Sequence, residues 1–93
     1  MSPDIRARFL PKFAKAGAER ISRCFELASR GESAGLAAQM HALAGEAAIL
    51  ELRVIADLAR EAESLARNSG SSAECERALR VLAEHVAALH VDA

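Results

Sequence analysis

Apolar residues recur along the chain every three or four positions, which is the spacing of one face of an α-helix. Four successive stretches carry such a stripe: residues 13–28, 36–47, 52–66 and 75–89. β-branched residues are sparse and scattered, so no stretch is expected to form a strand. The pattern predicts an all-α fold with four main helices.

Helix-breaking and capping residues predict where these helices begin and end. Pro11, just before the first stretch, interrupts the helical pattern, so we expect a short extra helix over residues 4–10 and Pro11 in the first turn of the next helix. Gly31 predicts a stop near residue 30, and Ser33 is expected to cap the second helix. The remaining signals are Asn68-Ser69-Gly70, which ends the third helix, and the capping box of Ser71 and Glu74 before the last.

One boundary has no local signal, because neither Pro nor a second Gly lies between Gly45 and Leu52. An uninterrupted helix over residues 34–67 would be about 50 Å long. A domain of this size has a radius of gyration near roughly 12 Å, so such a rod would leave its apolar stripe bare unless it dimerised. We therefore expect a turn near residues 48–51 and an up-down antiparallel four-helix bundle with a short extra N-terminal helix.

The composition excludes several classes of function. The 93 residues suffice for one domain, spanning residues 1–93. A formal net charge of −1 argues against a basic nucleic-acid surface, and 3% aromatic residues argue against a stacking platform for single strands. Charges at Asp4, Arg6 and Arg8 precede any apolar run, unlike in a signal peptide, and no uncharged stretch is long enough for a bilayer. We expect a cytoplasmic protein without membrane insertion.

The two cysteines and two of the three histidines fit no metal site. Cys24 and Cys75 lack metal-ligand spacing, and each falls on an apolar stripe, so we expect buried free thiols. His85 and His90 lie beside the last stripe, five residues apart rather than the four of a helical metal pair. We expect both histidines at the surface, and no metal or cofactor in this chain.

His41 differs from the other histidines in its neighbours. It lies one step from the apolar stripe, so its ring should project toward solvent. Every neighbouring position on the helix carries a methyl group or a hydrogen, which gives a flat surface that another protein's active site can approach. The residues alone leave open that an alanine-rich helix merely contains an exposed histidine. These neighbours, the expected partner-binding residues, are Ala37, Ala38, Ala44, Gly45 and Ala48.

The sequence around His41 resembles the histidine phosphotransfer (Hpt) family. Residues 41–45 are His-Ala-Leu-Ala-Gly, and Leu52-x-x-Ile55-x-x-Leu58 follows after small residues. The family pattern is His-x-Leu-Lys-Gly, then small residues, a turn and an amphipathic return helix. Residues 8–13, with Arg20 and Ile21 after them, are similar to the first helices of many Hpt domains. The resemblance covers nearly the whole chain.

This resemblance implies a phosphocarrier in two-component signalling, not an enzyme in its own right. Nε2 of His41 would take a phosphoryl group from a receiver aspartate or a sensor histidine kinase and pass it to another receiver. The carrier would be a monomer, and Mg²⁺ would be bound only by the partner receiver. Gly45 would allow the receiver to approach closely.

The resemblance also implies a role for Glu63. In the chemotaxis-kinase branch of the family, a glutamate on the following helix accepts the Nδ1–H of the histidine, and Glu63 occupies the matching position. The alternative is that Glu63 is a solvated carboxylate paired with Arg60 or Arg67.

Two departures from the family pattern bear on function. The family lysine is Ala44 here, so a cation for the phosphoryl oxygens is missing unless Arg53 or a lysine from the first helices replaces it. Glu51 replaces the usual turn glycine, and with Glu46 it adds negative charge near the site. These departures leave open an alternative function: a degenerate Hpt-like module that docks kinase or receiver domains without carrying phosphate.

Overall fold

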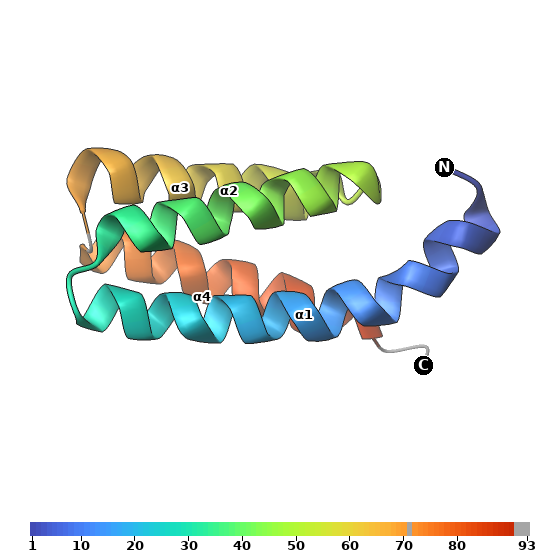
Figure 1. Ribbon diagram of the computed structural model, residues 1–93, viewed down its shortest axis with the longest axis horizontal. Helices are drawn as coiled ribbons and strands as arrows, with labels where there is room; N and C mark the ends of the chain where they lie inside the picture. Colours follow the sequence, from blue (N-terminus) through green and yellow to red (C-terminus); the bar gives the residue numbers. More distant parts are fainter. Residues whose placement is uncertain (71, 91–93) are drawn as a thin grey trace.

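Four α-helices run up and down alongside one another in the computed structural model, which describes residues 1–70 and 72–90 (Figure 1). They are α1 (Pro3–Ser29), α2 (Ser33–Ile49), α3 (Arg53–Ser69) and α4 (Ala73–Ala87), and a 3₁₀ turn, η1 (Ala88–His90), follows. The described residues contain no strand, so the predicted all-α bundle is confirmed. None of their helices is long and apolar enough to cross a membrane.

All four helices contribute to one apolar core. α2 and α3 form the most extensive helix pair, and alanines on their facing sides are almost completely buried, which lets the two backbones approach closely. No polar or charged side chain is buried anywhere in the described part of the chain. The largest side chains with almost no exposure are Leu36, Met40, Leu43, Leu79, Leu82, Val86, Cys24 and Cys75.

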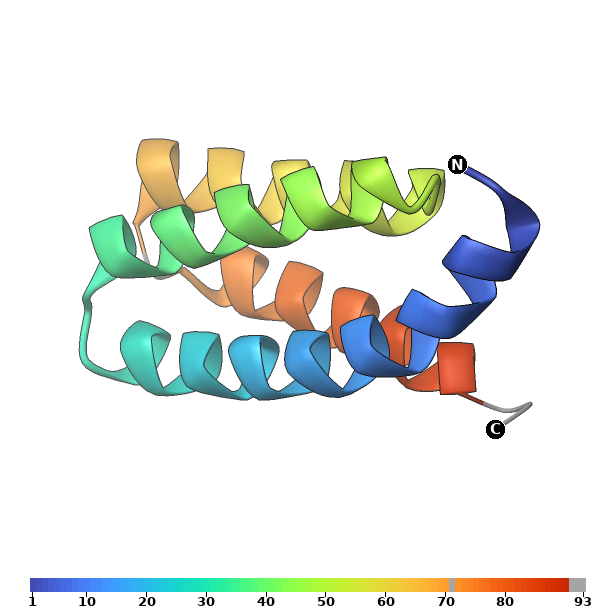
Figure 2. The same ribbon diagram turned by 45° about the vertical axis from the view of Figure 1, so that its right-hand side comes forward.

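The predicted separate N-terminal helix is wrong, because α1 continues through Pro11. Its first turns bend away from the bundle toward the end of α2 (Figure 2). The Ser2 hydroxyl caps the first of these turns, and Nε of Arg6 ties them to the end of α2 by donating to the carbonyl of Leu50 at 2.7 Å. A helix tolerates an interior proline when tertiary contacts hold it, at the cost of one backbone hydrogen bond.

α1 ends where the sequence predicts, and α2 begins one residue earlier than expected. Gly31 has a φ of 71°, its N–H donates to the carbonyl of Ala28, and the N–H of Glu32 donates to that of Leu27. This double hydrogen bond is a Schellman motif. Glu32 is therefore already the residue before α2, and Ser33 is helical rather than its cap.

The other predicted boundaries are confirmed in part. α3 ends at Ser69, and Gly70 follows with a φ of 67°. Ser72 caps α4, accepting from the backbone N–H of Cys75 at 3.1 Å. The expected capping residue Ser71 and the expected surface position of the His90 side chain lie outside the described residues.

The turn expected near residues 48–51 is present, although no glycine marks it. α2 ends at Ile49, and α3 begins at Arg53. The N–H of Leu52 donates to the carbonyl of Ala47 at 2.8 Å, and that of Glu51 donates to Ala48 at 3.0 Å, which forms a second Schellman motif. Glu51 holds a φ of 62°, a conformation that glycine adopts without strain and glutamate does not.

Cys24 and Cys75 are buried free thiols, as predicted. Burial raises the pKa of Cys24 to about 11, and it also raises the pKa of Cys75. Both side chains therefore act as small apolar core groups at neutral pH.

Replacing Glu51 with glycine should raise the free energy of unfolding by about 1 kcal/mol, because the positive φ then carries no steric cost. Urea denaturation followed by circular dichroism measures this change. The matched control is Gly31→Ala, which places a side chain at a φ of 71° with open space around it, so only backbone strain should lower stability. An unchanged or lower midpoint for Glu51→Gly would contradict the strain at this turn.

Candidate functional site

His41 stands on the outward face of α2, and its side chain is 76% exposed. Ala38, Gly45 and Ala48 follow the same outward face and are exposed as well. A Cβ atom added at Gly45 would meet no neighbouring atom within 4 Å. The predicted flat surface beside the imidazole is therefore present on this side.

The expected small-residue surface is too broad, because Ala37 and Ala44 are buried in the core. On a helix, positions four before and three after a residue lie on one flank of it, whereas positions three before and four after lie on the other. The flank with Ala37 and Ala44 is the one that α3 covers. These two residues are thus corrected from partner-binding positions to packing positions between helices.

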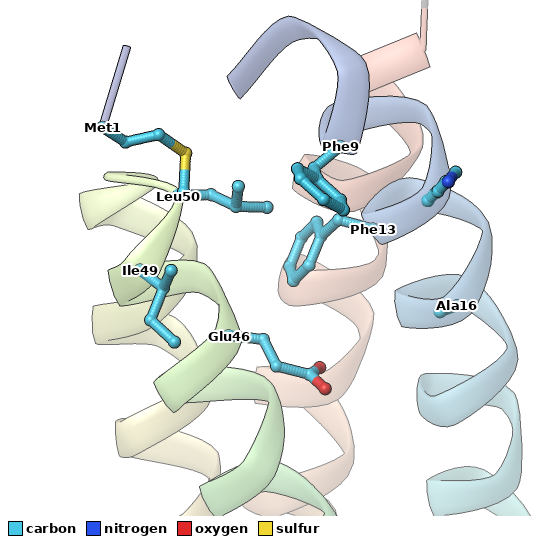
Figure 3. Close-up of a pocket in the computed structure, with 8 residues that line it drawn as sticks. Met1, Phe9, Phe13, Ala16, Glu46, Ile49 and Leu50 are labelled. Carbon is cyan, nitrogen blue, oxygen red and sulfur yellow. The ribbon is translucent and has the colours of Figure 1, made fainter. Parts of the chain in front are cut away.

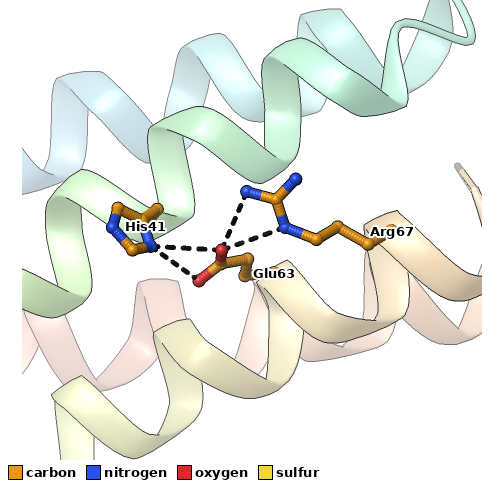
Figure 4. Close-up of polar contacts among 3 residues, drawn as sticks. All are labelled: His41, Glu63 and Arg67. Carbon is orange, nitrogen blue, oxygen red and sulfur yellow. Dashed lines mark hydrogen bonds and ion pairs between the residues drawn. The ribbon is translucent and has the colours of Figure 1, made fainter.

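On this flank of α2, α3 places Glu63 beside His41 (Figure 4). Nδ1 of His41 lies 3.2 Å and 3.3 Å from the two carboxylate oxygens, and the Glu63 side chain is only 16% exposed. Arg67 holds the same carboxylate: its Nε donates to Oε2 at 3.1 Å, and its Nη2 lies 3.0 Å from that oxygen. Of the two arginines considered from sequence, Arg67 pairs with Glu63, whereas Arg60 pairs with Asp57.

This geometry defines which ring nitrogen of His41 is available for chemistry. An ionised carboxylate only accepts hydrogen bonds, so contact with Glu63 favours the tautomer in which Nδ1 carries the proton. Nε2 then carries the lone pair. It points away from Glu63, toward the C-terminal half of α2 (Figure 4). The arrangement can present a neutral imidazole nucleophile to a group outside the protein.

Glu46 and Glu51, the two glutamates expected to add negative charge near the site, both have an arginine close by. Glu46 faces α1, where Nη2 of Arg20 lies 3.3 Å from its carboxylate. Arg20 also donates to Gln39 at 2.8 Å, a bridge between α1 and α2 that periodicity alone does not indicate. Glu51 lies at the turn, in the same hollow as Arg53.

An apolar groove opens on the α1 flank of α2 (Figure 3). Phe9 and Phe13 from α1 face Ile49, the last residue of α2, and Leu50 after it across a hollow of about 340 Å³. Ile49 is 67% exposed and Phe9 44% exposed, which is unusual for side chains of this size. The helical pattern of the sequence does not indicate this groove, because the groove depends on the bend of α1 toward the end of α2.

His85, another candidate ligand, lies on a different helix from the site. His85 is exposed on α4, and its Nδ1 lies 2.9 Å from the carbonyl oxygen of Val81. Among the side chains that the structure describes, no three of His, Cys, Asp or Glu come together as a metal site requires.

The comparison with protein families agrees with this geometry. The model of the family described as the Hpt domain matches residues 8–91, nearly the whole chain. The chain belongs to the Hpt family. Hpt domains are phosphotransfer carriers of two-component signalling rather than enzymes, and they act with kinase and receiver partners. Neither the search of curated proteins nor that of solved structures found a match.

The contact with Glu63 should set the tautomer of His41 in this Hpt domain. We expect Glu63→Ala to shift neutral His41 several-fold toward the form protonated on Nε2, because an acceptor for Nδ1–H is lost. Long-range ¹H–¹⁵N spectra of the imidazole measure the two forms. His85, on another helix, is the internal reference and should not change; an unaltered His41 spectrum would show that Glu63 does not orient the ring.

Proposed function

We propose that this Hpt domain carries a phosphoryl group on Nε2 of His41, taking it from a receiver aspartate or a sensor kinase and passing it to a receiver. The observation that carries the proposal is an exposed imidazole whose Nδ1 contacts a carboxylate while its Nε2 points outward. Exposure makes the ring accessible to a partner, and the carboxylate favours the nucleophilic tautomer.

In the proposed reaction, the lone pair of Nε2 attacks phosphorus. The Nε2–P bond forms as the P–O bond to the receiver aspartate breaks, and the bonding electron pair leaves with the aspartate carboxylate. The proton on Nδ1 stays hydrogen-bonded to Glu63, which offsets the positive charge that develops on the ring. Mg²⁺ on the partner receiver would supply the electrostatic stabilisation of the phosphoryl group. The carrier contributes a positioned nucleophile.

We propose that partners dock on the outward face of α2 around His41, over Ala38, Gly45 and Ala48. These side chains are too small to hinder a partner's active site from reaching Nε2. Ile49 lies one helical turn after Gly45, and Phe9 faces it across the apolar groove; both are exposed and would add buried area to a complex.

The function is tested by incubating the protein and its His41→Gln variant with a panel of phosphorylated receiver domains and Mg²⁺. We expect transfer to the wild type and none to the variant, because glutamine offers no nucleophilic nitrogen. The adduct should be labile in acid and stable in base. Receivers that bind the folded protein without transferring label, equally well with either version, would instead establish a docking module that carries no phosphate.

Docking on the outward face of α2 predicts that Gly45→Arg weakens receiver binding by about tenfold or more, because a long side chain then stands beside His41. The fold should persist, since the position faces open space and arginine is the better helix former. Isothermal titration with a receiver that transfers phosphate measures the affinity.

The matched control for Gly45→Arg is Leu43→Ala, two residues away on the buried face of α2. It should lower the free energy of unfolding by roughly 2–5 kcal/mol through a core cavity. Receiver affinity should be preserved at temperatures where this variant is folded. An unchanged affinity for Gly45→Arg would contradict the docking surface.

A further inference from the structure

The carrier proposed above has no cation on α2 beside the phosphoryl group. Position 44, which carries lysine in the family pattern, is a buried alanine here. A phosphoryl group on Nε2 would bring negative charge and oxygens that accept charge-assisted hydrogen bonds. A cation from another helix is therefore needed if these oxygens are to be bound by the carrier itself.

Most basic side chains near α2 are already engaged on other sides of His41. Arg20 holds Glu46 and Gln39 on the α1 flank. Lys12 lies over the ring of Phe9, with its Nζ 5.6 Å from the ring centroid. Arg67 is bound to the Glu63 carboxylate, on the Nδ1 side of the imidazole.

The antiparallel register of α2 and α3 brings one further arginine level with position 44. His41 lies opposite Glu63, and both helices run from that contact toward the turn at residues 50–52. Three residues toward the turn on α2 is Ala44, and three residues toward it on α3 is Arg60. Arg60 lines a hollow with Ala48 of α2, so its side chain lies on the flank of α3 that borders α2; Arg53 lines the part of this hollow nearer the turn. A second hollow, formed by α3 residues alone, places Arg60 beside Glu63.

In the part of the chain that the structure describes, Arg60 is held only by a solvent-exposed ion pair. Its side chain is 55% exposed, and its only ion pair in the described residues is with Asp57, three residues earlier, at 3.3 Å. Asp57 is itself 69% exposed, and exposed pairs of this kind contribute little to stability. Nε2 of His41 points toward this end of α2, away from Arg67 (Figure 4).

We propose that Arg60 binds the phosphoryl oxygens of phosphorylated His41 and replaces the cation that is missing at position 44. The inference rests on the proposed function, because it requires a phosphoryl group on Nε2. Arg60 exchanges Asp57 for the phosphoryl group when His41 is modified. Arg53 was the other replacement considered from the sequence. It lies about two helical turns closer to the N-terminus of α3, and therefore farther from the level of His41.

The test uses phosphoramidate as a small phosphoryl donor, so that no receiver contact contributes. Phosphorylation of His41 is followed by ³¹P NMR in the wild type, Arg60→Ala, Arg60→Lys and the control Arg53→Ala. We expect Arg60→Ala to be phosphorylated roughly tenfold more slowly, because a charge-assisted hydrogen bond is lost. Arg60→Lys should recover most of the rate, and Arg53→Ala should match the wild type.

A second readout separates phosphoryl binding from an effect on folding. A nearby cation favours the more highly charged phosphoryl group, so Arg60→Ala should raise the pKa of the phosphoryl group seen in a ³¹P titration, and Arg60→Lys should restore it. Equal rates and equal titrations in the wild type and Arg60→Ala would overturn the assignment, as would a loss in Arg53→Ala of the same size. A folded wild type that takes no label would contradict the proposed function as well.

Discussion

The backbone reversal between α2 and α3 requires Glu51 to hold a φ of 62°, and the position of the site follows from that reversal. The Schellman hydrogen bonds at residues 47–52 end α2, and the buried Leu50 and Leu52 fix the turn against the core. α3 then returns antiparallel to α2 in one register, since small residues on both helices pack closely. That register sets Glu63 beside His41, so a strained turn at one end of the helix pair positions a contact near its middle.

The environment of His41 differs on the two flanks of α2, and this difference makes the imidazole both oriented and accessible. On the α3 flank, a largely shielded carboxylate and Arg67 fix the Nδ1 side of the ring. On the open flank, Ala38 and Gly45 leave the ring accessible. A buried histidine would be positioned but unreachable, and a fully solvated one would be reachable but unoriented. Packing against one helix only provides both properties.

Sequence periodicity was sufficient to predict the four helices, the core stripes and the exposure of His41, because burial of apolar side chains determines all three. It failed where tertiary contacts override local preference. Pro11 is accommodated within α1 because Arg6 holds the first turns to Leu50, a contact 44 residues away in sequence. Ala37 and Ala44 are indistinguishable from exposed neighbours of His41 until the side on which α3 packs is known. The contact with Glu63 came from family resemblance, since a helical pattern contains no information on interhelical register.

The most direct test of this account is to determine which ring nitrogen carries the phosphoryl group after transfer from a phosphorylated receiver domain. Long-range ¹H–¹⁵N spectra, together with ³¹P coupling, distinguish the two nitrogens. We expect phosphorus on Nε2 of His41, with the proton retained on Nδ1 and bonded to Glu63. Phosphorus on Nδ1, or on any other residue, would contradict it, because the contact with Glu63 would then not define the reactive nitrogen.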